Sequence, residues 1–229
     1  YAIKSTGARV EIINGTGNEA SDSDATDGDG LLIDSIIQAK NYGIYSSGAA
    51  AEIENHGEII AEEQYAIQSI GSSATITNND KISANSIAIA SEGSATAVTN
   101  NNEITANSTG IVSSGVGYII KNENGGKITT TETAINSLGD GTQIENKGEI
   151  NTTGQTGITS SGGGVSIKNF NSISSDKKAI VSTGEYALIE NRGMLYTVSG
   201  DNIVSSGANA VVKNYYTGSI LSDGSVGID

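Results

Sequence analysis

One short pattern recurs along the chain and limits what the chain can fold into. A lead isoleucine is followed by Ser two residues later, by Gly four residues later and by Asn eleven residues later, and this pattern occurs nine times. In the first copy these residues are Ile3, Ser5, Gly7 and Asn14, and an apolar residue, Ile12, stands nine positions after the lead. The remaining leads are Ile44, Ile67, Ile89, Ile111, Ile135, Ile158, Ile180 and Ile203.

The spacing of the copies indicates a repetitive architecture. From Ile44 onward, successive lead isoleucines are 22 to 25 residues apart, counting a cut-off tenth copy at Ile228. Such a period is typical of a solenoid, in which each repeat forms one rung. Abundant Gly and few aromatic residues also occur in disordered chains, but a disordered chain has no reason to keep isoleucine in register. We therefore predict a single solenoid domain over residues 1–229, which we interpret as a piece of a longer protein.

The order of apolar and polar residues within a repeat predicts strands. Apolar or small residues alternate with polar ones in stretches such as 51–55. A third apolar position lies fifteen residues after most leads, as at Ile59 and Ile82. The sequence thus predicts an all-β, parallel β-helix with three strands per rung of 22–25 residues and about nine rungs. Parallel strands about 4.8 Å apart would make a rod roughly 45 Å long.

Small residues recur where the rungs should turn. Gly or Ala precedes the lead isoleucine in nine of ten copies, with Asn202 as the exception, which predicts a tight corner. Thirteen residues after the lead, the chain has residue types that tolerate a left-handed backbone, and we expect a sharp bend there. The Gly four residues after the lead receives the same explanation. The residues at offset thirteen are Gly57, Asp80, Asn102, Asn124, Gly148, Asn171 and Gly193.

The recurrent Asn has the same parity as the inward apolar residue two positions before it. We expect its side chains to stack at an inner corner and to bond from rung to rung, with a row of Asn that binds a ligand as the alternative. The recurrent Ser is also expected to point inward and to bond locally at a strand end. The predicted structural ladder consists of Asn14, Asn55, Asn78, Asn100, Asn122, Asn146, Asn169, Asn191 and Asn214.

Charged residues alternate in sign at two outward positions. Opposite charges on stacked neighbours would stabilise a sheet modestly, so we interpret both series as ladders rather than as sites. The net charge of −14 disfavours nucleic acid and anionic membranes as partners. The two series are Lys121, Glu145, Lys168, Glu190 and Lys213, and Glu58, Lys81, Glu103, Lys127 and Glu149.

The sequence offers little for catalysis. It has no Cys and one histidine, His56, which follows a corner Asn and is interpreted as an exposed turn residue. No nucleophile elbow, phosphate-binding loop, dinucleotide fingerprint or zinc-ligand spacing occurs. No apolar run reaches the roughly 18 residues that a membrane-spanning helix needs. We expect no enzymatic activity, no cofactor, no catalytic residue and no membrane insertion by this chain.

One segment departs from the regular repeat. Between the first two leads the spacing stretches to 41 residues, which predicts a loop insertion at about 18–30. Loops on a rigid solenoid commonly carry the binding function. This loop contains Asp22, Asp24, Asp27 and Asp29. They could serve a partner or offer oxygens to calcium, although the EF-hand pattern fails, and a solvated acidic loop is the alternative.

Tyrosines form a second group of candidates for partner binding. Tyr42 and Tyr65 stand two residues before the lead isoleucine on adjacent rungs. Tyr215 and Tyr216 are expected to lie near Tyr196 toward the C-terminal end. Exposed tyrosines favour recognition of proteins or sugars, whereas stacked tyrosines also serve packing between rungs, and both interpretations stay open.

These features together resemble a known family. The rung length, the inward isoleucines, the Asn corner, the polar faces and the lack of Cys are similar to the right-handed parallel β-helix passenger domains of bacterial autotransporters (type V secretion). The resemblance covers the chain apart from the segment near 18–30. It implies export through an outer-membrane barrel that this chain does not contain, followed by display on the bacterial surface or release.

The resemblance also implies a function. An adhesin of this type would bind a host-cell surface protein, the extracellular matrix or a glycan. The first alternative is a released effector that binds a specific host receptor and triggers signalling, and the second is a carbohydrate-active β-helix. Because fold alone does not assign function, these remain hypotheses. Exposed end rungs would also permit end-to-end self-association.

Overall fold

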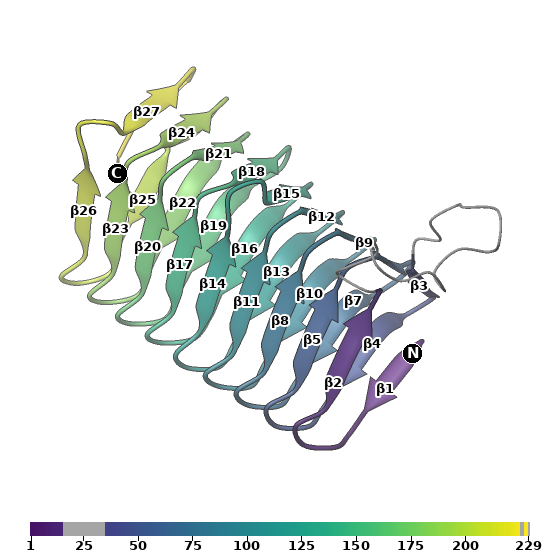
Figure 1. Ribbon diagram of the computed structural model, residues 1–229. Coiled ribbons are helices and arrows are strands. Elements are labelled where there is room, and N and C mark those ends of the chain that lie inside the picture. Colours follow the sequence, from purple (N-terminus) through teal and green to yellow (C-terminus); the bar gives the residue numbers. More distant parts are fainter. Residues whose placement is uncertain (16–34, 225–226, 229) are drawn as a thin grey trace.

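The protein is a parallel β-solenoid. The computed structural model describes residues 1–15, 35–224 and 227–228, and this part of the chain contains 27 strands and no helix. The strands form three parallel sheets of nine strands each, stacked along one axis with the chain ends at opposite ends of the rod (Figure 1). The predicted all-β fold with three strands per rung is confirmed. Having no helix, the described part also has none that could cross a membrane.

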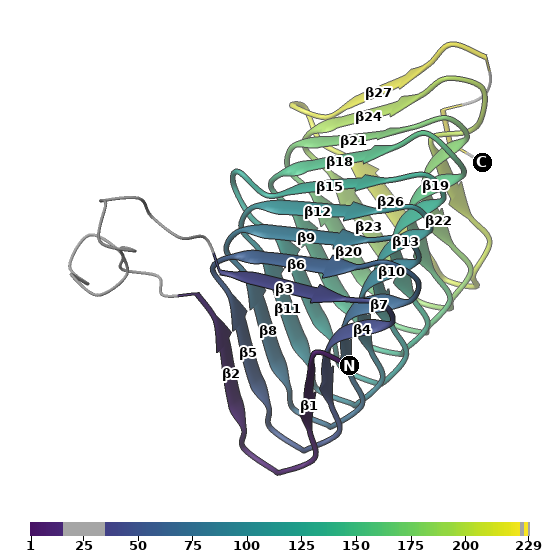
Figure 2. The ribbon, with the colours of Figure 1, turned by 90° about the vertical axis from the view of Figure 1, so that its right-hand side faces the viewer.

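Each rung contributes one strand to each sheet. Sheet 1 holds the strands around the lead isoleucines, sheet 2 holds the strands that end at the recurrent Asn, and sheet 3 faces the viewer in Figure 2. Sheet 1 contains β1 (Ile3–Ser5), β4 (Tyr42–Ser46), β7 (Tyr65–Ser69), β10 (Ile87–Ser91), β13 (Thr109–Ser113), β16 (Thr133–Ser137), β19 (Thr156–Ser160), β22 (Lys178–Ser182) and β25 (Ile203–Ser205). Sheet 2 contains β2 (Glu11–Asn14), β5 (Glu52–Asn55), β8 (Thr75–Asn78), β11 (Ala97–Asn100), β14 (Ile119–Asn122), β17 (Gln143–Asn146), β20 (Ser166–Asn169), β23 (Leu188–Asn191) and β26 (Val211–Asn214). Sheet 3 contains β3 (Ile36–Ala39), β6 (Glu58–Ala61), β9 (Lys81–Ala84), β12 (Glu103–Ala106), β15 (Lys127–Thr130), β18 (Glu149–Thr152), β21 (Ser172–Ser175), β24 (Met194–Thr197) and β27 (Ser219–Ser222).

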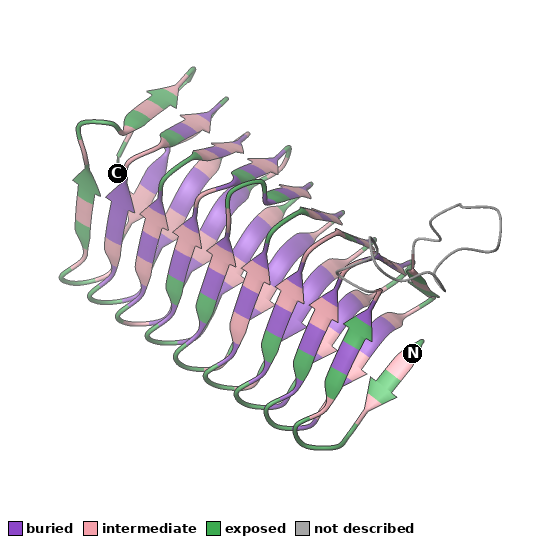
Figure 3. Ribbon diagram, in the orientation of Figure 1, coloured by how far each residue is buried: buried purple, intermediate pink, exposed green. Residues whose placement is uncertain are grey.

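The strand register places equivalent residues of successive repeats on top of one another. The lead isoleucines pair along sheet 1, as Ile44 does with Ile67. Each rung adds three inward apolar side chains to the core, and in one rung these are Ile44, Ile53 and Ile59, all fully buried. Burying such a side chain contributes about 1.5–3 kcal/mol. Burial therefore repeats from rung to rung and decreases at the two end rungs (Figure 3).

The corner before the lead isoleucine is as tight as the sequence predicts. Ala66 and Ala134 at this position are fully buried. A Cβ atom added to Gly43 would lie 2.6 Å from the carbonyl oxygen of Ala66 and 2.7 Å from a methyl group of Ile59. The exceptional residue, Asn202, is also fully buried, and its Nδ2 donates a hydrogen bond to the carbonyl oxygen of Leu221 at 2.7 Å.

The left-handed bend lies elsewhere than the sequence predicts. Six non-glycine residues have φ between 54° and 59°, and all six stand six residues after a lead isoleucine. At offset thirteen none of the described residues has a positive φ, so that prediction is wrong. Glycines occupy the offset-six position in three other rungs, at Gly117, Gly141 and Gly164. The six non-glycine residues are Arg9, Ala50, Ser73, Ala95, Tyr186 and Asn209.

A reversal of hydrogen bonding explains this position. In most turns the backbone N–H donates to the preceding rung, as Ser47 donates to the carbonyl of Ser5. At offset six the N–H donates to the following rung instead, as Ala50 does to Ser72 and Gly141 does to Gly163, each at 2.8 Å. The positive φ rotates the peptide N–H so that it points toward the following rung. The inter-rung hydrogen bond offsets the roughly 1–2 kcal/mol that a side chain costs in this conformation.

The Gly four residues after the lead is required for a different reason than the one predicted. Its φ is not left-handed. A Cβ atom on Gly48 would overlap the carbonyl oxygen of Gly7, and one on Gly139 would overlap that of Gly115. The same holds along the column from Gly48 to Gly207, because each of these glycines lies directly against the glycine carbonyl of the preceding rung. Close approach of two backbones, rather than conformational freedom, therefore excludes every side chain here.

The two reasons for glycine can be separated in a single turn. We expect Gly139→Ala to destabilise the rung by about 3 kcal/mol or more, because the backbones must move apart. Gly141→Ala should cost only about 1 kcal/mol, since Gly141 has a φ of 65° with no atom within 4 Å of an added Cβ, and Ala50 already adopts this conformation. Denaturant unfolding with hydrogen exchange measures both. Equal losses for the two variants would contradict the distinction.

The recurrent Asn residues form a continuous inner ladder. Each Nδ2 from Asn14 to Asn191 donates to the Oδ1 of the next Asn along the rod, and all eight of these bonds are 2.8 Å long. The same Nδ2 groups also donate to backbone carbonyls at the corner, as Asn146 does to Ser172 at 3.1 Å. Seven of the nine are fully buried, so the ladder satisfies amides that burial would otherwise leave without partners.

The recurrent Ser residues point inward, but they do not bond as predicted. The Oγ atoms of seven of them are buried with no hydrogen-bond partner in the described part of the chain. Ser91 differs, because its Oγ accepts a hydrogen bond from the hydroxyl of fully buried Tyr118 at 3.1 Å. The expected local bond at the strand end is therefore wrong. The seven are Ser46, Ser69, Ser113, Ser137, Ser160, Ser182 and Ser205.

Substitutions in the Asn column and in the Ser column should have different effects on the free energy of unfolding. We expect Asn146→Ala to lower the free energy of unfolding by about 2–4 kcal/mol, because it removes bonds from Asn122 and to Asn169 and Ser172. Ser137→Ala, in the same rung, should leave stability unchanged or raise it by about 1 kcal/mol, since the hydroxyl has no partner. Denaturant unfolding of both variants measures this. A loss at Ser137 as large as at Asn146 would refute the assignment.

Candidate functional site

Four tyrosines gather on the outer face of sheet 1 near the N-terminal end. Tyr42 and Tyr65 are register partners on β4 and β7, and their ring centroids lie 5.4 Å apart in a stacked arrangement. Tyr1 stacks on the other side of Tyr42 at 4.7 Å, and Tyr45 meets the ring of Tyr1 at a steep angle, 5.1 Å away. The structure thus brings together the two tyrosines singled out in the sequence. We call Tyr1, Tyr42, Tyr45 and Tyr65 the tyrosine cluster.

The geometry of β4 explains why the sequence pattern missed Tyr45. Gly43 and Ile44 both point inward, so the alternation of a strand is broken once in each rung of sheet 1. The residues on either side of this inward pair, Tyr42 and Tyr45, consequently face the same way. A strict period of two residues assigns them to opposite faces. The recurrent pair of a small residue and an isoleucine is the signal that could have placed Tyr45.

The tyrosine cluster has a cation at its edge. The ammonium group of Lys4 lies 5.3 Å from the ring centroid of Tyr1 and 5.8 Å from that of Tyr45, within the range of cation–π attraction. Burial, together with the neighbouring tyrosines, raises the pKa of the Tyr42 hydroxyl. The cluster therefore presents neutral, amphipathic ring edges beside one positive charge. Such a surface is suited to recognition of a protein or a sugar.

A second aromatic group lies toward the C-terminal end, on sheet 2 and its corner. The Tyr215 hydroxyl donates to Oε1 of buried Glu190 at 2.5 Å. The guanidinium of Arg192 lies 3.9 Å from the Tyr215 ring centroid and 5.4 Å from that of Phe170. Arg192 and Lys213 also approach Glu190, at 3.8 Å and 3.9 Å. These contacts bind the side chains to one another, which favours a structural role for Tyr215.

The other C-terminal tyrosines do not join Tyr215. The hydroxyl of Tyr196, on sheet 3, donates to Asp223 at 2.6 Å, and this hydrogen bond raises the pKa of Tyr196. Tyr216 is fully exposed. No ring contact among these three tyrosines occurs in the described residues, so they do not form a second stacked cluster. Sequence neighbours 215 and 216 face different surroundings because they lie at a turn.

The outward charges are in register, but they pair only in part as predicted. Lys81 pairs with its register partner Glu58 at 2.8 Å, and this hydrogen bond raises the pKa of Lys81. Glu145, however, pairs with Lys147 on its own rung at 2.7 Å instead of with its register neighbours. Lys147 also reaches Glu123 at 3.0 Å, and its hydrogen bonds to both carboxylates raise its pKa. The prediction omitted this adjacent outward column.

The single histidine is less exposed than predicted. The His56 side chain is 21 % exposed, and its Nε2 lies 3.1 Å from a carboxylate oxygen of Glu54. The amide of Asn79 on the next rung lies 3.4 Å from the same ring nitrogen. These contacts hold the ring against the corner, which accounts for its partial burial. The hydrogen-bond partners found for His56 in the described chain do not include a Ser hydroxyl that a base could activate.

The acidic segment predicted to bind a partner or calcium falls outside the part of the chain that the structure describes. Asp22, Asp24, Asp27 and Asp29 lie outside the described residues, so both expectations for them stay predictions. Over residues 1–15, 35–224 and 227–228, no group of three or more His, Cys, Asp or Glu side chains is arranged to hold a metal ion.

Comparison with known proteins adds no family. Protein-family models, curated protein sequences and solved structures gave no match to this chain. Interpretation of its function therefore rests on the repeat, the solenoid and the surface groups described above.

The group around Glu190 predicts a pH-dependent stability. The hydrogen bond from Tyr215, with the charges of Arg192 and Lys213, lowers the pKa of Glu190 below its ordinary value of 4.5. Its stabilising contribution is therefore present above about pH 4.5 and is lost as the pH falls through the lower folded value. We expect Glu190→Gln to lower the melting temperature at neutral pH, with a difference from wild type that shrinks in acid. Glu185→Gln, at an exposed residue, is the control and should show no such trend.

Proposed function

We propose that this chain is the β-solenoid shaft of a secreted or surface-displayed bacterial protein of the autotransporter passenger type. In this proposal the shaft acts as a non-catalytic adhesin that binds a protein, matrix component or glycan of a host cell. The tyrosine cluster is the observation that carries the proposal. There, four large amphipathic side chains of the described residues share one outer face.

Grouping together with exposure distinguishes this cluster, because Tyr186 and Tyr216 are also exposed but have no ring contact among the described residues. Tyr1 is 59 % exposed, and Tyr42, Tyr45 and Tyr65 are partly exposed, although stacking already uses parts of their rings. Aromatic side chains grouped on a rigid surface are frequent energetic centres of interfaces, because they lose little conformational entropy on binding. By contrast, Tyr118 is fully buried, and Tyr215 and Tyr196 are each bonded to a carboxylate.

The architecture supports a role in display. Each rung contacts only its neighbours, so a solenoid extends by addition of rungs, and each folded rung serves as a template for the next. The polar groups of the interior are used in packing, and the outer faces are left to carry variable residues. A regular rod of this kind holds surface side chains at fixed spacing, which is the property that an adhesive shaft requires.

The proposal predicts that binding depends on the tyrosine cluster. The purified chain is screened against host-cell surfaces, extracellular-matrix proteins and glycans, and Tyr42→Ala/Tyr65→Ala should weaken saturable binding by about tenfold or more. Tyr216→Ala is the matched control, because Tyr216 is fully exposed at the other end of the rod, and it should change affinity less than about twofold. Circular dichroism must show that both variants keep the wild-type fold.

Two outcomes would count against the proposal. The first is the absence of saturable binding by the wild-type chain, and the second is equal binding by the Tyr42→Ala/Tyr65→Ala variant. A cellular signalling response to the soluble chain would favour the released effector, and turnover of a glycan would favour the carbohydrate-active alternative.

A further inference from the structure

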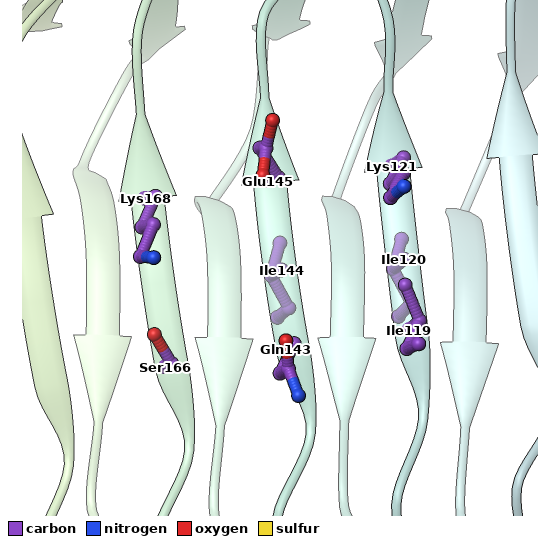
Figure 4. Close-up of a pocket in the computed structure, with 8 residues that line it drawn as sticks. All are labelled: Ile119, Ile120, Lys121, Gln143, Ile144, Glu145, Ser166 and Lys168. Carbon is purple, nitrogen blue, oxygen red and sulfur yellow. The ribbon is translucent and has the colours of Figure 1, made fainter.

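A shallow groove crosses the outer face of sheet 2 near the middle of the rod. It runs over β14, β17 and β20, and its space of about 290 Å³ includes open solvent, so it is a shallow surface depression and not an enclosed pocket (Figure 4). One side of the groove is formed by Ile119, Gln143 and Ser166, which are register partners on the three strands. The other side is formed by Lys121, Glu145 and Lys168.

The charges in this groove are unbalanced. Glu145 lies between the two lysines in the register, but its carboxylate pairs with Lys147 at 2.7 Å. Glu190, on the other side of Lys168, pairs with Arg192 and Lys213 and accepts the Tyr215 hydroxyl.

Both carboxylates that adjoin the lysines are thus bound by other partners. Within the described residues no carboxylate oxygen comes within 4.0 Å of the ammonium group of Lys121 or Lys168. The groove therefore has a cation on each outer strand and no carboxylate that neutralises either cation directly.

The remaining lining defines the chemistry of a ligand. Lys121 and Lys168 are two rungs apart, which corresponds to about 9.6 Å along the rod, so an extended ligand with repeated anionic groups could reach both. Gln143 and Ser166 add hydrogen-bonding groups, and Ile119, 40 % exposed, adds an apolar surface. Hydroxyls, an apolar ring face and a carboxylate or sulfate occur together in acidic sugars.

Nucleic acid fits the groove less well. No aromatic side chain lines it, so unpaired bases have no ring on which to stack. The net charge of −14 also opposes a dense polyphosphate, whose binding requires clustered cations. A short acidic oligosaccharide presents its carboxylate or sulfate groups on successive sugars, and two lysines can match two of these groups locally.

We propose that this groove binds an acidic oligosaccharide, with Lys121 and Lys168 pairing with its carboxylate or sulfate groups. The inference rests on the proposed adhesive function, for which it names a ligand class. The groove lies on sheet 2 and the tyrosine cluster on sheet 1, so the two sites can be tested separately.

The test measures binding of defined sugars to the whole chain by calorimetry. The probes are a sulfated heparin oligosaccharide, a carboxylated oligogalacturonate and a neutral dextran oligosaccharide. We expect at least one acidic probe to bind and dextran not to bind, with affinity that falls between about 0.05 M and about 0.5 M sodium chloride. Lys121→Gln/Lys168→Gln should weaken this binding by about tenfold or more, because two charge-assisted bonds are lost.

A second double variant controls for the change in net charge. Lys177→Gln/Lys178→Gln removes the same number of positive charges away from the groove and should alter affinity less than about twofold. An equal loss in both double variants, equal binding of dextran, or no binding of either acidic probe would overturn the assignment. Tighter binding of a single-stranded oligonucleotide would overturn it in favour of nucleic acid.

The outcome is separable from that of the proposed function. Loss of acidic-sugar binding in Lys121→Gln/Lys168→Gln but not in Tyr42→Ala/Tyr65→Ala would support the groove as a distinct site. Host-surface binding that depends on the tyrosines while no acidic sugar binds would leave the adhesive proposal standing and remove the groove.

Discussion

The spacing of hydrogen-bonded parallel strands governs the rest of this structure. Every rung lies about 4.8 Å from the next, so each residue has the equivalent residue of the neighbouring repeat as its closest companion. Isoleucine therefore packs on isoleucine through the interior. At the turn after sheet 1, two backbones approach so closely that Gly139 has a carbonyl oxygen where its side chain would begin. A substitution in one rung is consequently felt first by the two rungs beside it.

The same spacing explains why two polar columns of the interior behave differently. An amide carries its donor and its acceptor on separate atoms, so Asn55 can reach Asn78 at 2.8 Å across a gap of one rung. A serine has a single oxygen, and oxygens repeated at about 4.8 Å are too far apart to bond to one another. Ser91 has a partner because Tyr118 supplies a hydroxyl from another column. The Asn column holds rungs together, whereas the Ser column fills space.

On the outside, the spacing brings charges and rings into rows without deciding how they pair. Lys147 takes the carboxylate of Glu145 because it stands on the same rung, two residues away, and its long side chain can turn toward it. Because Glu145 pairs with Lys147, Lys121 and Lys168 have no direct carboxylate partner within the described part of the chain, and the groove between them is cationic. The repeat keeps the backbone regular, and the proposed adhesive role depends on how the individual outward side chains pair on it.

The repeated isoleucines and the Asn at offset eleven determined the all-β solenoid, its three strands per rung and its register, because strand parity and period are local properties of a sequence. The pattern also placed Tyr42 over Tyr65, since residues at one position of the repeat must stack. Tertiary structure alone decided that Ala50 bends left-handed, that Gly139 is needed for close approach, and that Tyr45 joins Tyr42. It also decided that His56 is partly buried and that Tyr196 and Tyr215 bond to different carboxylates. Each of these depends on which atoms of a neighbouring rung lie within a few ångströms, and that distance is set only when the rungs have stacked.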